Sequence, residues 1–388
     1  MIAAATASTR VLVVTGESSG EQHTAGLLDA LSERAPERNF KFRGTGGRLL
    51  EERGVRLLAD TRDLAAIGPL AALSNLSKYV FTFRRLVRMA EAWRPQIALL
   101  VDFPEFNLRL AKRLTRIGIP VCYFISPQLW AWRERRVESV RRHVDQMLVI
   151  LPFEEHFYRG HGIEAHFVGH PSVHLRSHRK RSPQPSSRPL IALMPGSRRA
   201  EIDKMLKLFL EAGRIIAARL PADFRVLVGP DLDLRKIQQR VGYLQAAICA
   251  SLSLEVRQGP VEELLPDCDY AIIKSGTSTL QSLILEVPFS MVYRMSALSY
   301  WMLRPLVSAR SYCLANLIAG EPIVPEFVQS RARPELIAEH ALGLLQSPAN
   351  WQQLKQNLKN ASEKLGTEDA YRRAAGYLIG LLEDSCES

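Results

Sequence analysis

Short, uninterrupted apolar runs that end in small or polar residues recur along the whole chain. The clearest are IALLV at 97–101 and IALM at 191–194, and a helical pattern of apolar residues follows each of them. Runs without polar alternation are typical of parallel strands that are buried on both faces. We therefore expect an α/β protein with doubly wound parallel sheets.

The length and one change in composition predict two domains. A chain of 388 residues exceeds the size of one ordinary core. Residues 176–189 (RSHRKRSPQPSSRP) are rich in basic residues, serine and proline, as linkers are. We predict a first domain over 1–177, a linker over 178–188 and a second domain over 189–360.

Charge and cysteine content narrow the class of protein. The 51 Lys and Arg against 40 Asp and Glu give a net charge of +11. This predicts an anionic partner, which could be a phosphorylated substrate, a nucleic acid or an anionic membrane surface. The five cysteines are scattered without a C-x-x-C pair, which favours a reducing compartment and a chain without structural disulfides or zinc. The sequence has no signal-peptide pattern and no run of 18 apolar residues.

Two strand-to-helix turns in the second half predict an anion site. A strand ends at Pro195-Gly196-Ser197-Arg198, and a second strand ends at Lys274-Ser275-Gly276-Thr277. The free N–H groups at the start of a helix favour anions, and an arginine binds phosphate oxygens in pairs. Two such turns could hold both phosphates of a diphosphate. The alternative is a pair of ordinary turns with a solvated arginine; no G-x-x-x-x-G-K-[ST] motif is present.

The first half offers a carboxylate at the end of a strand. Asp102 directly follows the apolar run of 97–101, at the edge where α/β sheets place their sites. It could be a general base, or it could be the N-cap of the helix that starts near Pro104. The strand at 10–14 leads into a small-residue loop over 15–21, and we predict a helix from His23 to Arg34.

Three other stretches leave more than one interpretation open. Residues 64–93 combine apolar and aromatic residues with Arg84, Arg85 and Arg88, so the helix could lie on an anionic membrane or simply have a solvated basic face. Trp130 and Trp132 beside basic residues could stack on bases, but more often such residues close a pocket. Six histidines over 156–178 lack a thiolate or acidic ligand set, and we expect solvated loop residues rather than a metal site.

A series of motifs along the chain resembles the lipid-A-disaccharide synthase family of glycosyltransferases. The family's motifs match, in order, GESSG at 16–20, VDFPEFN at 101–107, YFISPQLWAW at 123–132, LPFE at 151–154, VGHP at 168–171, PGSR at 195–198, SGTSTL at 275–280, NLIAG at 316–320 and VPE at 324–326. The resemblance implies a GT-B fold, in which two Rossmann-like domains face a central cleft. It also implies that the helices of 361–388 pack back onto the N-terminal domain.

The resemblance implies a reaction and roles for particular residues. The family moves 2,3-diacylglucosamine from UDP to the 6-hydroxyl of 2,3-diacylglucosamine 1-phosphate, with inversion and without a metal or other cofactor. Asp102 would be the catalytic base. The UDP-sugar donor would be bound by residues of the two turns: Gly196, Ser197, Arg198, Ser275, Gly276, Thr277 and Gln281. The cleft would be lined by residues of the first loop and the last motif: Gly16, Glu17, Ser19, Asn316, Glu326 and Gln329.

The same resemblance implies a location and partners. The acylated donor and acceptor reside at the cytoplasmic face of the inner membrane, so we expect a cytoplasmic protein, peripheral to that membrane, whose 64–93 stretch contacts it. A homodimer is compatible with the resemblance, and nucleic acid is not an expected partner. The alternatives are a related UDP-sugar transferase or epimerase with another acceptor, and a basic RNA-binding or membrane-surface module without enzymatic activity.

Four positions depart from the family pattern. Glu21 and Glu105 stand where the family usually has aspartate, and Lys274 is atypical before the S-G-T motif. Gln281 replaces a glutamate that usually bonds the ribose hydroxyls, and a neutral amide makes weaker bonds to hydroxyls than a carboxylate. These changes put the donor preference, rather than the fold, in question.

Overall fold

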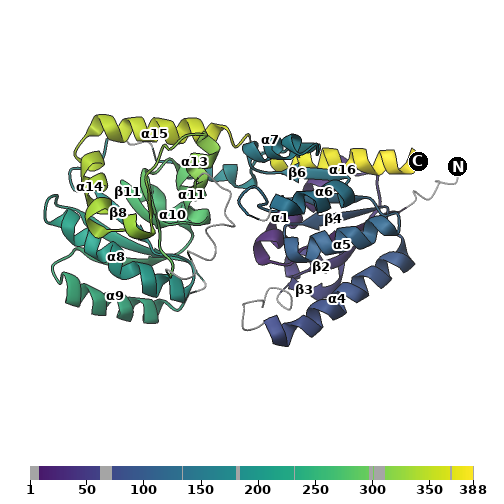
Figure 1. Ribbon diagram of the computed structural model, residues 1–388, viewed down its shortest axis with the longest axis horizontal. Coiled ribbons are helices and arrows are strands. Elements are labelled where there is room, and N and C mark those ends of the chain that lie inside the picture. Colours follow the sequence, from purple (N-terminus) through teal and green to yellow (C-terminus); the bar gives the residue numbers. More distant parts are fainter. Residues whose placement is uncertain are drawn as a thin grey trace. The chain divides into compact units, whose positions relative to one another are not determined.

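The computed structural model describes residues 8–61, 72–132, 134–180, 184–230, 232–296, 300, 311–367 and 369–387, and for 72–76 and 385–387 it describes only the backbone (Figure 1). The chain forms two compact units. The first contains residues 1–171 and 366–388, and the second contains 172–365. The stretch from 178 to 188, which the sequence predicts as a linker, is part of the second unit.

The first unit contains a seven-stranded parallel sheet. Its strands are β1 (Thr9–Val14), β2 (Phe40–Gly46), β3 (Val55–Asp60), β4 (Ile97–Val101), β5 (Val121–Phe124), β6 (Gln146–Val149) and β7 (Ala165–Phe167). They are arranged in the order β3-β2-β1-β4-β5-β6-β7. All five residues of β4 are buried, as the apolar run predicts.

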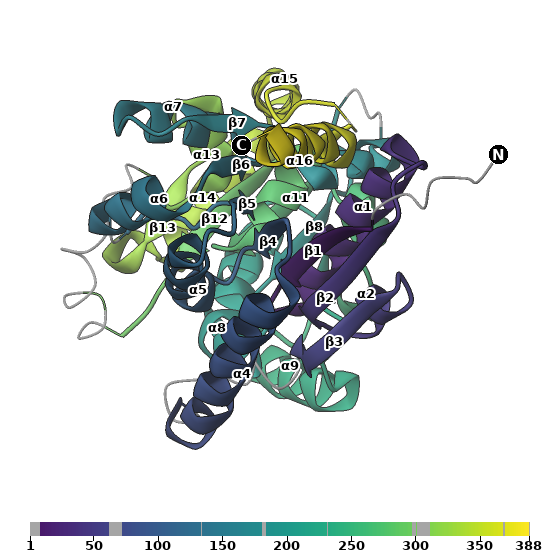
Figure 2. The same ribbon diagram turned by 90° about the vertical axis from the view of Figure 1, so that its right-hand side faces the viewer.

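Helices cover both faces of this sheet. They are α1 (Ser18–Arg34), α2 (Arg48–Glu51), α4 (Ala72–Trp93), α5 (Pro104–Arg116), α6 (Val137–His143), α7 (Pro152–Gly160) and α16 (Ala370–Glu387). Figure 2 shows α1 and α2 on one side of the sheet and α4 and α5 on the other. The C-terminal helix α16 packs against α1, so both ends of the chain contribute to the first unit.

The second unit repeats this architecture with six parallel strands. They are β8 (Leu190–Met194), β9 (Asp223–Val228), β10 (Leu254–Gln258), β11 (Tyr270–Lys274), β12 (Phe289–Tyr293) and β13 (Glu326–Val328), in the order β10-β9-β8-β11-β12-β13. The helices are α8 (Arg199–Ala217), α9 (Leu234–Ile248), α10 (Val261–Leu264), α11 (Thr277–Leu285), α13 (Leu314–Ala319), α14 (Pro334–Leu345) and α15 (Pro348–Glu363). The prediction of an α/β protein with two doubly wound sheets is therefore confirmed.

In each sheet the direction of strand addition reverses once. The reversal lies between β1 and β4 in the first unit and between β8 and β11 in the second. Loops leave such a pair of strands in opposite directions, which opens a crevice beyond the carboxyl ends of the strands. These two switch points are where ligands are expected to bind.

The start of α1 differs from the sequence-based prediction. The helix begins at Ser18 rather than at His23, so most of the expected loop forms the first helical turn. Thr24 Oγ1 donates a hydrogen bond of 2.6 Å to the carbonyl oxygen of Gly20 inside this turn. Serine and glycine have weak helix propensity, and tertiary packing overrides that preference here.

The histidines of 156–178 also differ from the prediction that all are solvated. His170 is only 6% exposed, and the ring of His166 stacks on that of Tyr377 at 4.2 Å between centroids. Within the described ranges, no group of three or more His, Cys, Asp or Glu side chains could hold a metal ion. None of the helices in these ranges is both long and apolar enough to cross a membrane.

Candidate active site

Asp102 lies at the switch point of the first unit, directly after β4. Its backbone has a φ of +47°, and the following Phe103 has a φ of +51°. Such left-handed conformations are costly for residues other than glycine, and they cluster at functional sites. The Asp102 carbonyl accepts hydrogen bonds from the Tyr123 hydroxyl at 2.6 Å and from Asn107 Nδ2 at 2.8 Å. These two buried groups fix the backbone that carries the carboxylate.

The environment of Asp102 raises its pKa to about 6. Burial is the main cause, because it disfavours the charged form, and the nearby Glu17 carboxylate adds to it. A carboxylate with this pKa is ionised near neutral pH and is a stronger base than an ordinary aspartate. That combination suits a general base that accepts a proton from a hydroxyl.

The loop between β1 and α1 contacts the loop that carries Asp102. A Cβ atom on Gly16 would lie 2.3 Å from the Phe103 ring, so only glycine lets these two loops approach so closely. Glu17 is the N-cap residue of α1, but its side chain makes no capping hydrogen bond. Glu17 and Ser19 are exposed at this edge. The structure thus brings Gly16 and Glu17 together with Asp102 at the carboxyl edge of the first sheet.

Glu21 and Glu105, the two departures in this unit, have partners within the protein. The buried Glu21 accepts a hydrogen bond of 2.9 Å from the Leu49 N–H at the start of α2. Glu105 binds the guanidinium of Arg136 through two hydrogen bonds of 2.7 and 3.0 Å. Both carboxylates therefore connect neighbouring elements of the first unit.

A buried carboxylate that the sequence analysis gives no role lies beside this site. Glu154 is 2% exposed and accepts hydrogen bonds from Ser126 Oγ at 3.2 Å and Trp130 Nε1 at 3.1 Å. It also accepts a bond of 3.1 Å from the Leu151 N–H, and burial raises its pKa to about 7. Glu154 thereby holds the segment that follows β5, next to Asp102. The LPFE and SPQLWAW motifs contain these residues, but only the fold shows that they meet.

The two glycine turns of the second unit lie side by side at its switch point. Gly196 follows β8 with a φ of +129°, and β8 pairs directly with β11, which leads to Ser275 and Gly276. A Cβ atom on Gly196 would lie 3.3 Å from Lys274 Cδ. The starts of α8 and α11 are therefore adjacent, which the binding of one diphosphate by both turns requires.

Charged groups surround the start of α8. Glu201 Oε2 accepts a hydrogen bond of 3.3 Å from the Ser197 N–H, and Glu201 Oε1 pairs with Lys274 Nζ at 2.9 Å. Arg198 is the N-cap residue and is exposed. Lys274, for which a salt bridge is one of the expected roles, thus links the two turns through Glu201, a partner that the sequence does not identify.

The remaining donor residues lie around α11. Ser275 Oγ donates a hydrogen bond of 3.1 Å to the Tyr312 carbonyl, and Thr277 begins the helix with an exposed side chain. Gln281 lies on the second turn of α11 and is partly exposed.

The residues of the last motif form a hydrogen-bonded group. Asn316 Nδ2 donates to Glu326 Oε1 and to the Val324 carbonyl, both at 2.9 Å, and the Val324 N–H donates to Asn316 Oδ1. Glu326 also accepts hydrogen bonds from Ser311 Oγ and from the Tyr312 N–H. The polar atoms of Asn316 and Glu326 therefore serve the packing of this loop.

Gln329 stands apart from that group. It has a φ of +51° and follows β13 at the carboxyl edge of the sheet. Its side-chain Oε1 accepts a hydrogen bond of 2.8 Å from the Met295 N–H. The group of Asn316 and Glu326 also reaches the glycine turns, because Glu326 accepts from the Tyr312 N–H and the Tyr312 carbonyl accepts from Ser275.

Comparisons with known proteins agree with these observations. The family model described as lipid-A-disaccharide synthetase matches residues 11–378. Lipid-A-disaccharide synthase of Anaeromyxobacter dehalogenans is 39% identical over 382 residues, which cover 96% of this chain and 97% of the relative. The enzyme of that name from Myxococcus xanthus is 36% identical over 381 residues, again with 96% and 97% coverage.

Solved structures share the fold at low sequence identity. A UDP-N-acetylglucosamine 2-epimerase from Neisseria meningitidis, bound to UDP-GlcNAc, has a TM-score of 0.61 at 13% identity and covers 96% of this chain and 100% of its own. A spinosyn rhamnosyltransferase in complex with thymidine diphosphate has a TM-score of 0.54 at 12% identity, with 96% and 99% coverage. These likenesses support the GT-B fold class with two Rossmann-like units. The family model and the two relatives, which match nearly the full length, show that the chain belongs to the lipid-A-disaccharide synthetase family, whose members are UDP-sugar-dependent glycosyltransferases.

Proposed function

We propose that the chain is a lipid-A-disaccharide synthase. It transfers 2,3-diacylglucosamine from UDP to the 6-hydroxyl of 2,3-diacylglucosamine 1-phosphate and releases UDP. The observation that carries the mechanism is Asp102, a carboxylate held at a switch point by two buried side chains, with a pKa raised to about 6. A base of this kind is what the activation of an acceptor hydroxyl requires.

The transfer is a single displacement that inverts the anomeric centre. The 6-hydroxyl oxygen of the acceptor attacks the anomeric carbon of the donor while its proton passes to the Asp102 carboxylate. The bond from the anomeric carbon to the UDP oxygen breaks, and UDP leaves with the electron pair. Protonated Asp102 then returns its proton to solvent. The bond that breaks is a glycosyl phosphate and the bond that forms is an acetal; because UDP is the better leaving group, the transfer needs no oxidant and no further energy source.

The second unit would hold the leaving group. The α8 and α11 helix starts meet at one edge of the sheet, and their free N–H groups favour an anion there. The exposed Arg198 can donate paired hydrogen bonds to phosphate oxygens, and Gly196 and Ser197 form the turn before it. Ser275, Gly276 and Thr277 would approach the second phosphate. These groups would stabilise the charge that develops on UDP, without a metal ion.

The other predicted residues would complete the substrate contacts. We assign Gln281 to the ribose, and Glu17 and Ser19 to the acceptor side, where they are exposed beside Asp102. Gly16 serves by letting Phe103 approach. Gln329 would contact the donor sugar, whereas the satisfied hydrogen bonds of Asn316 and Glu326 favour a role in shaping the loop.

We also propose that α4 brings the first unit to the cytoplasmic face of the inner membrane. Phe81 is 66% exposed and Val80 is 37% exposed, which is unusual for large apolar side chains. The same helix carries exposed Arg84, Arg85 and Arg88. Exposed apolar residues among basic ones are typical of helices that lie on anionic lipid. Residues 64–71, the first part of the predicted membrane stretch, lie outside the described residues.

The test is formation of the disaccharide by purified protein. UDP-2,3-diacylglucosamine and radiolabelled 2,3-diacylglucosamine 1-phosphate are supplied with EDTA, and the product is separated by thin-layer chromatography. We expect disaccharide 1-phosphate at a rate that EDTA does not change. If UDP stabilises the protein against thermal unfolding but no disaccharide forms, the acceptor is a different molecule. Absence of both product and UDP binding would refute the proposal. Sedimentation velocity tests whether the enzyme is a homodimer.

A further inference from the structure

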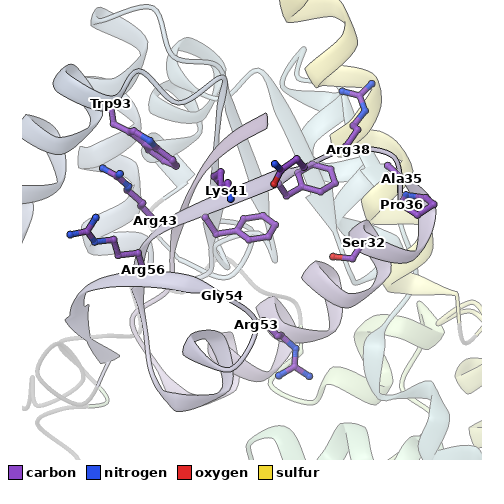
Figure 3. A pocket seen from close by; sticks show the side chains of 13 residues that line it. Ser32, Ala35, Pro36, Arg38, Lys41, Arg43, Arg53, Gly54, Arg56 and Trp93 are labelled. Carbon is purple, nitrogen blue, oxygen red and sulfur yellow. The ribbon is translucent and has the colours of Figure 1, made fainter. Parts of the chain in front are cut away.

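A basic hollow surrounds the first residues of β2, at the amino edge of the first sheet. Its volume is about 720 Å³, and it lies between the end of α1, the start of β3 and the last residue of α4 (Figure 3). Asp102 and the loop after β1 lie at the carboxyl edge of the same sheet. The seven residues of β2 span roughly 20 Å, so this β2 pocket is separate from the candidate active site.

The β2 pocket has an unusual charge. Of its 13 lining residues five are basic, and none is acidic: Arg38, Lys41, Arg43, Arg53 and Arg56. Two of these cations are already neutralised, because Arg38 pairs with Glu383 at 2.7 Å and Arg53 binds Asp29 through two bonds of 2.8 and 2.7 Å. Among the residues that the structure describes, no acidic side chain pairs with Lys41, Arg43 or Arg56. The pocket therefore holds three uncompensated positive charges.

The strand register forces two of these cations together. Arg43 of β2 and Arg56 of β3 are direct partners in the parallel ladder, so both side chains leave the same face of the sheet. Like charges at such positions repel each other and destabilise the sheet. Figure 3 shows both arginines on the side of the strand where Trp93 lies. An anion bound between them would remove the repulsion.

One aromatic ring, that of Trp93, lies beside the cations. The guanidinium of Arg43 lies over the Trp93 ring, 4.7 Å from its centroid, and this contact limits the directions in which Arg43 can point. Phe40 and Phe42 stack with 5.7 Å between centroids and an interplanar angle of 10°. Because β2 extends two residues beyond the start of β3, Phe40 and Lys41 lie next to an unpaired strand edge. Phe40 and Phe42 alternate with Lys41 and Arg43 along β2, so their rings lie on the opposite face of the strand, and Trp93 is the aromatic ring on the side of the cations.

We propose that the β2 pocket binds an organic anion of the phosphate class. The phosphate would lie between Arg43, Arg56 and Lys41, where a guanidinium pair can donate several charge-assisted hydrogen bonds. The organic part would lie near the Trp93 ring, which is on the same side of the strand as the arginines (Figure 3). The phosphate could belong to a soluble small molecule or to the headgroup of an anionic lipid, and the two sources are separated by experiment.

The first experiment is calorimetric titration of the full chain with inorganic pyrophosphate. Wild type is compared with Arg43→Gln/Arg56→Gln and with a matched control, Arg113→Gln/Arg116→Gln. The control arginines are exposed on α5 in the same unit and change the net charge equally. We expect the pocket variant to bind pyrophosphate at least about tenfold more weakly than wild type does. The control variant should bind it with unchanged affinity. Lys41→Gln is a second pocket variant, should the double variant fold poorly.

The second unit could also take up pyrophosphate at its glycine turns, so each titration is repeated in an Arg198→Ala background. Loss of binding there with Arg43→Gln/Arg56→Gln supports the pocket regardless of whether the donor site is correct. Equal affinities of the pocket variant and wild type in that background would overturn the proposal for soluble phosphates.

The second experiment is co-sedimentation with vesicles of phosphatidylcholine and phosphatidylglycerol. If pyrophosphate does not bind but sedimentation depends on Arg43 and Arg56 and not on Arg113 and Arg116, the pocket binds lipid headgroups. If the pocket and control variants lose sedimentation equally, and pyrophosphate does not distinguish them, the charge is non-specific and the proposal is wrong.

Discussion

Asp102 has a strained backbone conformation and a buried carboxylate whose charged form is disfavoured. Its φ of +47° is held by hydrogen bonds from Tyr123 and Asn107, and burial raises its pKa to about 6. Between about pH 4 and pH 6 the folded protein binds more protons at this site than the unfolded chain does. The stability contributed by Asp102 therefore falls as pH rises through this window, and at neutral pH the charge destabilises the fold.

Replacement of Asp102 by Asn should consequently separate activity from stability. We expect turnover to fall by at least about 100-fold, because the base is lost. We also expect the free energy of unfolding at pH 7 to increase by about 1–2 kcal/mol. This is less than the full pKa shift would give, because the side chain is partly exposed to solvent. Thermal unfolding at pH 4 and pH 7 measures the second effect, and the gain should shrink at the lower pH. A variant that is less stable than wild type at pH 7 would contradict the assigned environment.

Gln281 gives a second prediction at this scale. Gln281→Glu restores the carboxylate that the family usually has, and charge-assisted bonds to ribose hydroxyls are stronger than neutral ones. We expect UDP to bind about three- to tenfold more tightly, as measured by calorimetry. Gln239→Glu on α9, an exposed residue of the same unit, is the control for the added charge and should leave the affinity unchanged. Equal UDP affinities of Gln281→Glu and wild type would mean that this side chain does not face the ribose.

Individual residues show what sequence alone can and cannot predict. The positions of Asp102 and Gly196 at strand ends follow from apolar runs and glycine turns, and the structure agrees. Glu154 could not be given a role, because its partners Ser126 and Trp130 are more than 20 positions away and only tertiary packing brings them together. The pair of Glu201 and Lys274 was hidden for the same reason.

At the scale of elements, the turns that leave β1 and β4 fit each other through one missing side chain. A Cβ on Gly16 would overlap the Phe103 ring, and Phe103 is the residue next to Asp102. The turn is thus coupled sterically to the position of the base. The sequence predicted a loop here, but α1 begins at Ser18, which brings Glu17 to the helix start.

Gly16→Ala should displace Phe103 and with it Asp102. We expect a loss of about 1–3 kcal/mol in stability, typical of overpacking, and a lower turnover number. The double variant Gly16→Ala/Phe103→Ala removes the clash and should recover part of the stability. Gly160→Ala in α7 is the control, because nothing lies within 4 Å of the added Cβ there. If Gly16→Ala has the same stability and the same turnover number as the control variant, the two loops are not coupled.

At the scale of the whole molecule, the chain uses one architecture twice. Both units have the same strand order around their switch point, β3-β2-β1-β4 in the first and β10-β9-β8-β11 in the second. The predicted fold class and the two-unit organisation follow from the repeating strand and helix pattern. The arrangement of the last helices follows less directly, since α16 returns to α1 across more than 300 residues of chain.

Although the two units share one architecture, we expect UDP to bind only to the second. Hydrogen exchange of the full chain with saturating UDP should slow at the amides of residues 196–202 and 275–281. Because ligand binding stabilises mainly the segments that it contacts, residues 16–21 and 102–107 should change little. The opposite distribution of protection would mean that the donor binds the first unit.

The most direct test of the account compares Asp102→Ala with Arg198→Ala for both UDP affinity and turnover. We expect that Asp102→Ala retains wild-type UDP affinity and loses turnover by orders of magnitude, whereas Arg198→Ala binds UDP at least about tenfold more weakly. Near-normal turnover of Asp102→Ala, or unchanged UDP affinity of Arg198→Ala, would contradict the assignment of base and diphosphate site to the two switch points.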